Sequence, residues 1–396
     1  MKKENLQKFF IGALIATLAT TAGYLIAPIE VRFLSTLTNN SILIGLTFAI
    51  GSLVFAFLSI WVGRLSDKLG REKFILIGLL LGIIYPLFYA STYNIFQYMG
   101  VRCIWAFSGV AIGPIFMAYL QDLLKDNKKK GYYFGILFSV QSISGSVGAL
   151  LGGILSDSYN LAAPYYAISF IFLLATIISI TQFKFKEKKD KSKMPEEKRD
   201  LLFSLRYMFK KPELVFYFFQ NTGFGLGWGI KPFLWPIIIY ELAGKDIITG
   251  CIFATMGIMA FFVLPFAGKF VDKNGPFHGA MIAMSILGCS GLVLAFSKDL
   301  SIIWIAAAIY AIGEAVNGPA QAILLTENIE SKYRGEMLGL DAVLDRSIQT
   351  ISPFIAGLFL TFLAPQEVLF FYITVYWITL LILIYIYNTK IKIKQK

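Results

Sequence analysis

Long apolar stretches alternate with short polar segments along nearly the whole chain. A helix needs about 20 apolar residues to cross the hydrocarbon core of a bilayer. Stretches of about this length predict twelve spans, at approximately 9–36, 42–62, 74–93, 96–120, 132–155, 164–183, 213–240, 248–266, 278–296, 300–326, 336–363 and 367–388. The ten-residue segments of alternating polarity that typify a membrane β-barrel do not occur. The pattern therefore predicts an all-α membrane protein with twelve transmembrane helices.

Composition and charge support this prediction and exclude other classes. Hydrophobic residues make up 57% of the 396-residue chain and charged residues 15%, which is more apolar surface than a soluble domain buries. The net charge is +12, but Lys and Arg are concentrated in alternate connections and at both ends. By the positive-inside rule both termini are expected in the cytoplasm, with the protein in the cell membrane. A basic face against anionic lipid explains the excess charge without nucleic acid.

Motifs of enzymes and cofactor sites do not appear in the sequence. It contains no P-loop, no G-x-S-x-G and no H-E-x-x-H pattern, and its three cysteines fall inside predicted spans. We therefore expect no catalytic activity, no cofactor, no metal and no disulfide framework. The first span follows Met1-Lys2-Lys3 as a signal peptide would, but its apolar character continues to about residue 36 without a clean cleavage site. We interpret it as an uncleaved first helix.

The longest polar segment divides the chain near its middle. It predicts an N-terminal six-helix bundle at 1–183, a cytoplasmic linker at 184–212, and a C-terminal six-helix bundle at 213–396. The end of the linker carries apolar residues at helical spacing between basic ones, which predicts an amphipathic helix on the membrane surface. The linker is otherwise interpreted as a tether without chemistry.

The two halves share a pattern at a fixed offset. Gly63, Asp67 and Gly70 recur 205 positions later as Gly268, Asp272 and Gly275, and Asp122 recurs as Glu327. After one deletion the offset becomes 204, where GALLGG at 148–153 matches SPFIAG at 352–357. Matches at one offset in different helices predict a duplicated six-helix unit. An even number of spans per half gives both copies the same orientation, related by an axis along the membrane normal.

Between the second and third spans the chain reads G-x-x-x-D-x-x-G-R-x-K, at Gly63, Asp67, Gly70, Arg71 and Lys73. Together with twelve helices in two halves and a long basic middle loop, this motif resembles the major facilitator superfamily over the whole chain. Glycine allows the backbone bends of a short turn, and Arg71 can fork onto Asp67 and Asp122. The resemblance implies that this cluster, with Asp272 and Glu327 in the second copy, is a conformational latch for the outward-facing state. Simple anchoring of the topology by charge is the alternative.

Charged residues inside predicted spans are the candidates for function, because charge is costly in hydrocarbon. Acidic and basic members balance, so pairing is expected; they are Glu30, Glu314, Asp341 and Asp345 with Arg32, Arg102, Lys231 and Arg346. A carboxylate that loses its cation in a conformational change can take up a proton. We rank Glu314 first for this role, then Asp345 and Glu30, with Asp341 last. The alternative for each is a structural ion pair.

The fourth and fifth spans resemble drug/proton antiporters. GVRCIWAFSGVAIGP contains the expected Arg102, although Ala106 replaces a glycine. The fifth span follows the antiporter glycine pattern at Gly135, Gly148, Gly152 and Gly153, although Ser144 and Ala149 depart from it. Small residues also let helices pack closely, which is the alternative interpretation of this motif. Tyr24, Trp105, Trp228 and Trp235 could line a substrate pocket, but interfacial belts and core packing explain such aromatics at least as well.

These observations predict a secondary transporter that moves a small organic solute by alternating access. Proton-coupled efflux is favoured, proton-coupled uptake of a metabolite is the alternative, and a receptor or scaffold on a carrier fold is a distant one. The expected partners are a small-molecule solute, protons or another ion, and membrane lipid. The oligomeric state stays open, with a monomer as one option.

Overall fold

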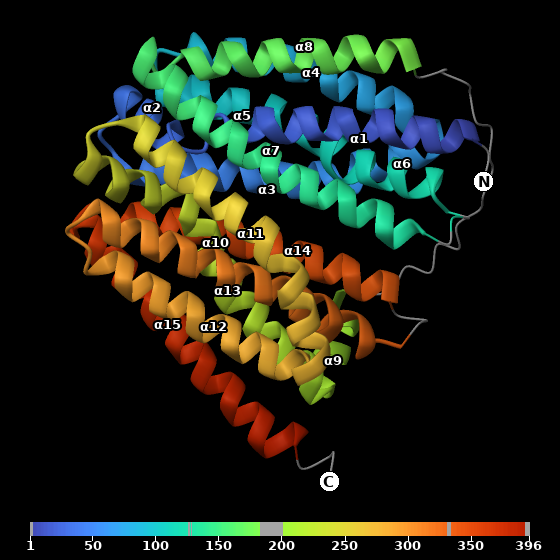
Figure 1. The fold of residues 1–396 in the computed structure, drawn as a ribbon, viewed down its shortest axis with the longest axis vertical. Helices are drawn as coiled ribbons and strands as arrows, with labels where there is room; N and C mark the ends of the chain where they lie inside the picture. Colours follow the sequence, from blue (N-terminus) through green and yellow to red (C-terminus); the bar gives the residue numbers. More distant parts are fainter. Residues whose placement is uncertain (1–2, 126, 128, 183–200, 331–333, 393–396) are drawn as a thin grey trace. The chain divides into compact units, whose positions relative to one another are not determined.

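The computed structural model describes residues 3–125, 127, 129–182, 201–330 and 334–392, which are almost entirely helical (Figure 1). The first part of the chain forms α1 (Lys3–Tyr24), α2 (Glu30–Leu37), α3 (Ser41–Leu69), α4 (Arg71–Ala90), α5 (Ile95–Val110), the π-helical η1 (Ala111–Ile115), α6 (Phe116–Leu123), α7 (Lys130–Ser158) and α8 (Ala163–Gln182). The rest forms α9 (Leu201–Lys210), α10 (Pro212–Ala243), α11 (Asp246–Asn274), α12 (Pro276–Ala295), α13 (Leu300–Glu327), α14 (Arg334–Phe359), α15 (Pro365–Ile386) and the π-helical η3 (Tyr387–Ile391).

Each of the twelve predicted spans corresponds to helical structure, which confirms the all-α prediction for the described residues. Ten helical segments in this part of the chain are long and apolar enough to cross a membrane. The other two predicted spans are α10 and α14, which have 32 and 26 residues. Both carry ionisable residues in their interior, namely Lys231 in α10 and Asp341, Asp345 and Arg346 in α14. These charges lower the hydropathy of the two helices without shortening them.

The first predicted span, 9–36, is not one helix. Regular helix ends at Tyr24, and the turn at 25–29 holds tight backbone hydrogen bonds such as Leu25 N–H to Ala22 O and Ala27 N–H to Tyr24 O. Pro28 lies in this turn, and its ring nitrogen cannot donate a helical hydrogen bond. A second helix, α2, then begins at Glu30. The prediction of a continuous helix was wrong because it followed the apolar character and ignored Pro28.

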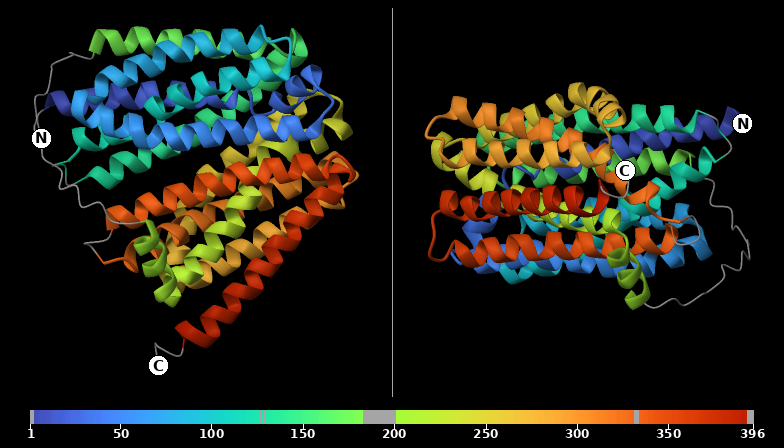
Figure 2. Two further views of the ribbon diagram at one scale, coloured as in Figure 1. Left: turned by 180° about the vertical axis from the view of Figure 1, so that it is seen from behind. Right: turned by 90° about the horizontal axis from the view of Figure 1, so that it is seen from below.

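The contacts divide the chain into two compact units. Unit 1 comprises residues 1–193 and 243–254, and unit 2 comprises residues 194–242 and 255–396. Within unit 1, α1 packs on α7 and α8, α3 on α5, and α4 on α8. Within unit 2, α12 packs on α13 and α15, and α9 on α14. Most of the long helices within each unit run roughly parallel or antiparallel to one another, while the short α9 lies across its neighbours (Figures 1 and 2).

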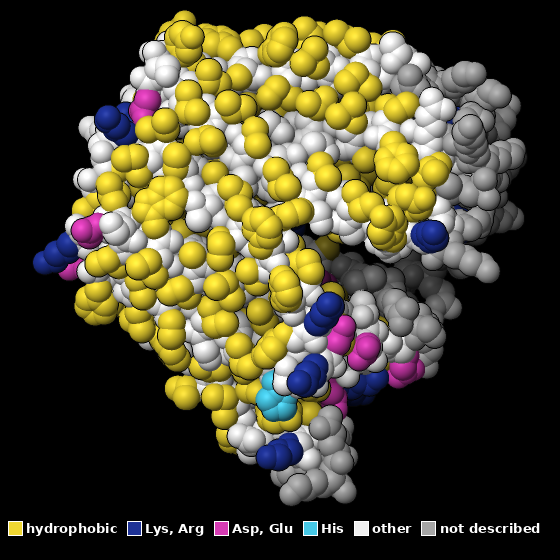
Figure 3. Space-filling model, in the orientation of Figure 1, with side chains coloured by type: hydrophobic (Ala, Val, Ile, Leu, Met, Phe, Trp, Pro, Cys, Tyr) yellow, Lys and Arg dark blue, Asp and Glu magenta, His cyan; other side chains and the backbone are white. Residues whose placement is uncertain are grey.

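Apolar side chains cover the outer faces of many helices. Large hydrophobic residues are at least 59% exposed at several positions, among them Phe57, Trp61, Phe170, Phe262 and Leu381. On the face drawn in Figure 3, charged side chains lie near the ends of the helices and yellow apolar ones between them. An exposed apolar surface of this kind is stable against lipid tails and unstable against water.

The predicted linker at 184–212 lies largely outside the described residues. Its end forms α9, as the helical spacing predicted, and Met208 in this helix is fully buried. Lys211, which follows α9, has its Nζ 3.6 Å from Glu330 Oε1 and 4.9 Å from the ring centre of Tyr207. The hydrogen bond with Tyr207 raises the pKa of Lys211 above its usual value. The placement of α9 on a membrane surface stays a prediction.

Candidate functional site

Glu30 and Arg102 form a buried ion pair inside unit 1. Arg102 reaches from α5 to the first residue of α2, with its Nη2 2.5 Å from Glu30 Oε1. The side chains of Arg102 and Glu30 are only 4% and 8% exposed. Tyr98 donates a hydrogen bond to the same carboxylate oxygen at 2.7 Å, and its hydroxyl lies 3.0 Å from that of Tyr165. The structure therefore brings together two of the charges singled out in the sequence.

Aromatic rings enclose this ion pair. The guanidinium carbon of Arg102 lies 5.1 Å from the ring centre of Phe48, 5.0 Å from that of Trp105 and 5.7 Å from that of Tyr98. Rings at this distance attract a cation through their negative faces. Gly51 in α3 provides the space, since a Cβ there would lie 3.2 Å from Arg102 Cδ. The Arg102 guanidinium is therefore stabilised by one carboxylate and several rings, with little exposure to solvent.

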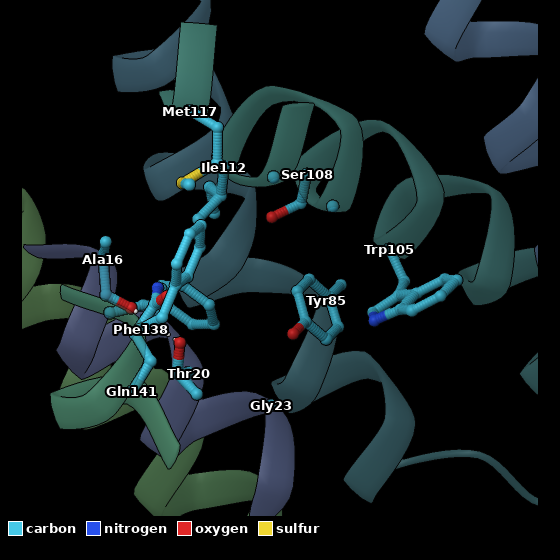
Figure 4. Close-up of a pocket in the computed structure, with 14 residues that line it drawn as sticks. Ala16, Thr20, Gly23, Tyr85, Trp105, Ser108, Ile112, Met117, Phe138 and Gln141 are labelled. Atoms are coloured by element: carbon cyan, nitrogen blue, oxygen red, sulfur yellow. Dashed lines mark hydrogen bonds between the residues drawn. The ribbon is translucent and has the colours of Figure 1, made fainter. Parts of the chain in front are cut away.

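A cavity of about 330 Å³ lies within unit 1, beside this cluster (Figure 4). Helices α1, α4, α5, α6, α7 and α8 and the π-helical η1 contribute its walls. Four aromatic side chains take part, those of Tyr85, Trp105, Phe138 and Phe172. In the view of Figure 4, Tyr85 is drawn between Trp105 on one side and the polar residues Thr20 and Gln141 on the other. The aromatic-pocket alternative thus has a physical counterpart at Trp105.

Pro114 interrupts regular α-helical bonding at one wall of the cavity. It lies in η1, where the helix widens to a π-helical turn between α5 and α6. Proline removes one backbone donor from the helix, and single π-turns are frequent at functional sites. Ile112 and Gly113 of this turn line the cavity. The Gly113-Pro114 pair, which recurs as Gly318-Pro319, therefore shapes a wall in unit 1.

A second ion pair lies inside unit 2. Lys231 of α10 places its Nζ 3.1 and 3.2 Å from the two carboxylate oxygens of Glu314 in α13. Trp228 donates its indole N–H to Glu314 Oε1 at 3.0 Å, and Lys231 Nζ lies 4.7 Å from the ring centre of Tyr310. The Lys231 and Glu314 side chains are 16% and 29% exposed, more than the pair in unit 1. Trp228, considered for a substrate pocket, instead holds a carboxylate.

Asp341 is held by neutral groups. Tyr217 donates its hydroxyl to Asp341 Oδ1 at 2.5 Å, and Asn221 donates an amide N–H to the same oxygen at 3.2 Å. The amide of Gln321 hydrogen-bonds to Asn221. Among the described residues, no cation forms an ion pair with Asp341. Protonation of Asp341 therefore breaks no ion pair among the described residues.

The same chain of hydrogen bonds continues through further amides. Asn317 donates to Gln321 at 3.3 Å, and Gln220 donates to Asn317 at 2.5 Å. Gln220 is fully buried, and its Oε1 has no hydrogen-bond partner in the described part of the molecule. Sequence reasoning missed these amides because it searched the spans for formal charges alone. The signal was present as the adjacent Gln220 and Asn221 in α10 and as Asn317 and Gln321, four residues apart, in α13.

Asp345 and Arg346, the remaining candidates of α14, share one glutamine. Gln349 donates to Asp345 Oδ2 at 2.8 Å and accepts from Arg346 Nη1 at 3.1 Å. All three side chains are of intermediate exposure. Gly225 of α10 faces this region, since a Cβ there would lie 3.8 Å from Asp345 Oδ1. Asp345 therefore lies in unit 2 with Asp341, one helical turn along the same helix.

Arg32 contacts a residue that the sequence did not single out. Its guanidinium forms an ion pair with Asp246, the first residue of α11, and Ser156 of α7 donates to the same carboxylate oxygen at 2.5 Å. Asp157 accepts hydrogen bonds from two backbone N–H groups at the start of α11, at 3.1 and 2.8 Å. Asp246 is 1% exposed. It escaped notice because it lies in a predicted outer connection, and acidic residues are common at helix starts.

Arg71 makes both contacts expected from the sequence. Its Nη2 lies 2.9 Å from Asp67 Oδ1 and its Nη1 lies 2.8 Å from Asp122 Oδ2. Gly70 adopts a φ of +95°, which side chains disfavour, and it is the only residue between α3 and α4. The expected bend at Gly63 was wrong, because this residue lies inside α3 without a positive φ. Lys73 is exposed on the first turn of α4.

The second copy of the motif keeps the turn but not the ion pairs. Gly275 has a φ of +84° and directly precedes α12, as Gly70 precedes α4. Asp272 and Glu327 are exposed, and neither takes part in an ion pair among the residues that the structure describes. Pro276 occupies the position that corresponds to Arg71. The positive φ is thus shared by both copies, while the ionic contacts occur in unit 1.

The glycines of α7 differ in their surroundings. A Cβ added to Gly148 would meet the backbone oxygen of Thr21 in α1, and one added to Gly152 would meet that of Leu25 in the turn after α1. One added to Gly153 would lie 2.5 Å from the backbone oxygen of Asp246. A Cβ added to Gly135 would have no atom within 4 Å beyond its own stretch of helix.

Within the described residues, no group of three or more His, Cys, Asp or Glu is arranged to hold a metal ion.

Comparisons with known proteins give matches along the whole chain. The family model described as Major Facilitator Superfamily matches residues 9–344 and 217–396. An uncharacterised MFS-type transporter of Methanocaldococcus jannaschii is 26% identical over 329 residues, which cover 82% of this chain and 84% of that protein. The multidrug resistance protein MdtG of Proteus mirabilis is 26% identical over 409 aligned positions, covering 95% and 96% of the two chains.

Solved structures show the same architecture. The crystal structure of the nucleoside transporter NupG superposes with a TM-score of 0.82, covering 96% of this chain and 99% of that chain. The sequence identity is 12%, so this likeness concerns the fold alone. It agrees with twelve membrane helices as the fold of the present chain.

Proposed function

Because the chain belongs to the major facilitator superfamily, it is a multi-pass membrane transporter, and we propose that it exports a small organic solute in exchange for protons. The observation that carries this proposal is the set of buried or half-buried carboxylates at Glu30, Glu314 and Asp341. Ionisable groups in the interior of a membrane protein are expensive and typically mark a solute or proton pathway. The geometry supports this proposal because the three carboxylates have different partners. Glu30 pairs with a buried cation, Glu314 with a partly exposed cation, and Asp341 accepts from neutral donors.

Asp341 is the proposed proton-binding group in unit 2. Protonation of Glu314 would leave Lys231 without its counter-charge. Protonation of Asp341 on Oδ2 keeps both hydrogen bonds, because Tyr217 and Asn221 donate to Oδ1. This reverses the ranking suggested by the sequence, in which Glu314 came first. Glu314 and Glu30 are assigned the role of paired charges that hold their helices together. Mutation of these residues tests both assignments.

Export is favoured over uptake by the relatives. The MdtG proteins are named for multidrug resistance, and the cavity of unit 1 is largely apolar, as suits a drug-like solute. Uptake of a polar metabolite is the second candidate, favoured by the amide chain of Gln220, Asn221, Asn317 and Gln321. Amides of this kind bind hydroxyl and carbonyl groups of polar solutes.

Reconstitution into liposomes that enclose a pH-sensitive dye distinguishes these candidates. A panel of organic solutes is added outside, and proton movement is followed as each solute runs down its gradient. Protons that leave as the solute enters indicate exchange, and protons that enter with the solute indicate uptake by symport. We expect exchange with the wild-type protein and at least about tenfold slower proton movement with Asp341→Asn. Symport for every transported solute would overturn the proposed direction.

A further inference from the structure

The cavity of unit 1 is uncharged. Among the fourteen described residues that line it, none carries a formal charge. We propose that this cavity binds neutral, planar aromatic solutes and discriminates against organic cations and anions of the same size. The inference rests on the proposed function, since it names the class of solute that the transporter accepts.

The aromatic walls favour a flat ligand. Tyr85, Trp105, Phe138 and Phe172 come from α4, α5, α7 and α8, so rings face the cavity from four different helices. Between them lie small residues, among them Ala16 and Gly23. Rings prefer to pack offset or edge to face with other rings. A planar solute can therefore slide between these walls, where a branched one of equal volume would collide with them.

The polar groups of the cavity suit a neutral ligand with one or two hydrogen-bonding atoms. Gln141 is half-buried, and its amide has no hydrogen-bond partner among the described residues, so one donor pair and one acceptor are available to a ligand. Thr20 and Ser108 already donate their hydroxyls, to Ala16 O at 2.9 Å and to Gly78 O at 2.8 Å. They offer acceptor lone pairs only. These groups replace water around a carbonyl or an amine, but they cannot neutralise a full charge.

The nearest buried charges do not change this selectivity. Arg102 and Glu30 are paired with each other at 2.5 Å, so together they add no net charge to the cavity. Trp105 lies between the ion pair and the cavity, because its ring is 5.0 Å from the Arg102 guanidinium and also lines the cavity. Against these walls of unit 1, a charged ligand would give up part of its hydration without gaining a counter-ion, which is the costly case for burial.

The experiment compares three planar two-ring probes by equilibrium dialysis against the purified protein. They are 7-amino-4-methylcoumarin, which is neutral at pH 7, 1-methylquinolinium, a permanent cation, and coumarin-3-carboxylate, an anion. We expect the neutral probe to bind at least about tenfold more tightly than either charged probe. Gln141→Leu should weaken the neutral probe severalfold by removing its hydrogen bonds. Gln141→Glu should reverse the preference toward the cation.

The matched control is Asn160→Asp. It adds the same charge beyond the end of α7, outside the cavity, and keeps the acceptor for the Ala162 backbone N–H. It should leave all three affinities unchanged. Equal or tighter binding of the cation to the wild type, no binding of the neutral probe, or an unchanged preference in the folded Gln141→Glu variant each overturns the inference. Dialysis needs no ion gradient, so these results stand apart from any failure of proton exchange in liposomes.

Discussion

The carboxylate of unit 1 and those of unit 2 are stabilised away from water in different ways. Glu30 is 8% exposed and meets Arg102 among aromatic rings. Glu314 is 29% exposed and meets Lys231 and an indole N–H, while Asp341 accepts from neutral donors and has no ion pair among the described residues. An arginine with a delocalised charge suits a dry site, whereas lysine is a compact and strongly hydrated cation. The pair in unit 1 therefore suits a dry site, whereas under the proposed function Asp341 is the carboxylate of unit 2 that changes its charge.

The difference matters because a buried ion pair is costly to break. Removal of one partner leaves an uncompensated charge, and the loss of stability is about 3–5 kcal/mol for buried pairs. A carboxylate held by hydroxyl and amide groups carries no such penalty when it is protonated. On this view the two halves of the repeat divide the work, with a fixed ionic anchor in unit 1 and a proton-binding chain in unit 2.

The largest expected effect is that of Arg102→Gln. This change leaves Glu30 buried without its cation and should destabilise unit 1 by about 3–5 kcal/mol, seen as a lower midpoint of thermal unfolding in detergent. The double variant Arg102→Gln with Glu30→Gln should recover much of that loss, because no unpaired charge remains. Lys231→Gln is the comparison in unit 2 and should cost less, since Glu314 is more exposed to solvent. Equal losses at both sites would contradict the contrast.

The next effect tests the packing of the two copies. Gly152→Ala places a methyl group against the backbone oxygen of Leu25, in the turn after α1, and should cost about 1–3 kcal/mol by overpacking. The corresponding residue of unit 2 is already alanine, Ala356, which is fully buried. Gly135→Ala is the control on the same helix, because a Cβ there meets open space. Comparable unfolding midpoints for the two variants would rule out the close contact between α7 and the turn after α1.

Much of this arrangement could be predicted from the sequence. The repeat offset led to a turn at Gly70 and at Gly275, and both have a positive φ because only glycine adopts that conformation freely. The contacts of Arg71 followed from local spacing and from the end of the fourth span. Features fixed by nearby residues or by backbone sterics were therefore accessible without coordinates.

Pairings between distant helices were not accessible in the same way. Charge balance suggested that the intramembrane charges pair, but it could not assign Glu30 to Arg102 or Arg32 to Asp246, which are 72 and 214 positions apart. The amides around Asp341 were missed because neutral polar residues barely change the hydropathy of a span. Partner choice depends on how helices rotate about their axes, and periodicity fixes this only approximately.

The third prediction concerns proton binding in unit 2. Asp341→Asn keeps an acceptor for Tyr217 and Asn221 but cannot ionise, so proton movement in liposomes should fall at least about tenfold while the unfolding midpoint changes little. Glu30→Gln in unit 1 should instead lower the unfolding midpoint clearly, because it leaves Arg102 without its counter-charge. Solute exchange measured without a pH gradient controls for a blocked pathway. A normal rate of proton movement in Asp341→Asn would contradict the proposal that Asp341 binds the transported proton.

The smallest effect is expected at the turn shared by the two copies. Asp67 and Asp122 are 50% and 65% exposed, and exposed ion pairs contribute only about 0–1 kcal/mol each. Asp67→Asn should therefore leave the stability of unit 1 almost unchanged, but it should alter solute turnover two- to fivefold, on the order of 1 kcal/mol, if Arg71 biases the transporter between two states. Asp272→Asn, at the equivalent position in unit 2, removes the same charge where no ion pair occurs among the described residues. Its turnover should equal that of the wild type. If both variants change turnover equally, charge at the turn acts through the surrounding field rather than through the contacts of Arg71.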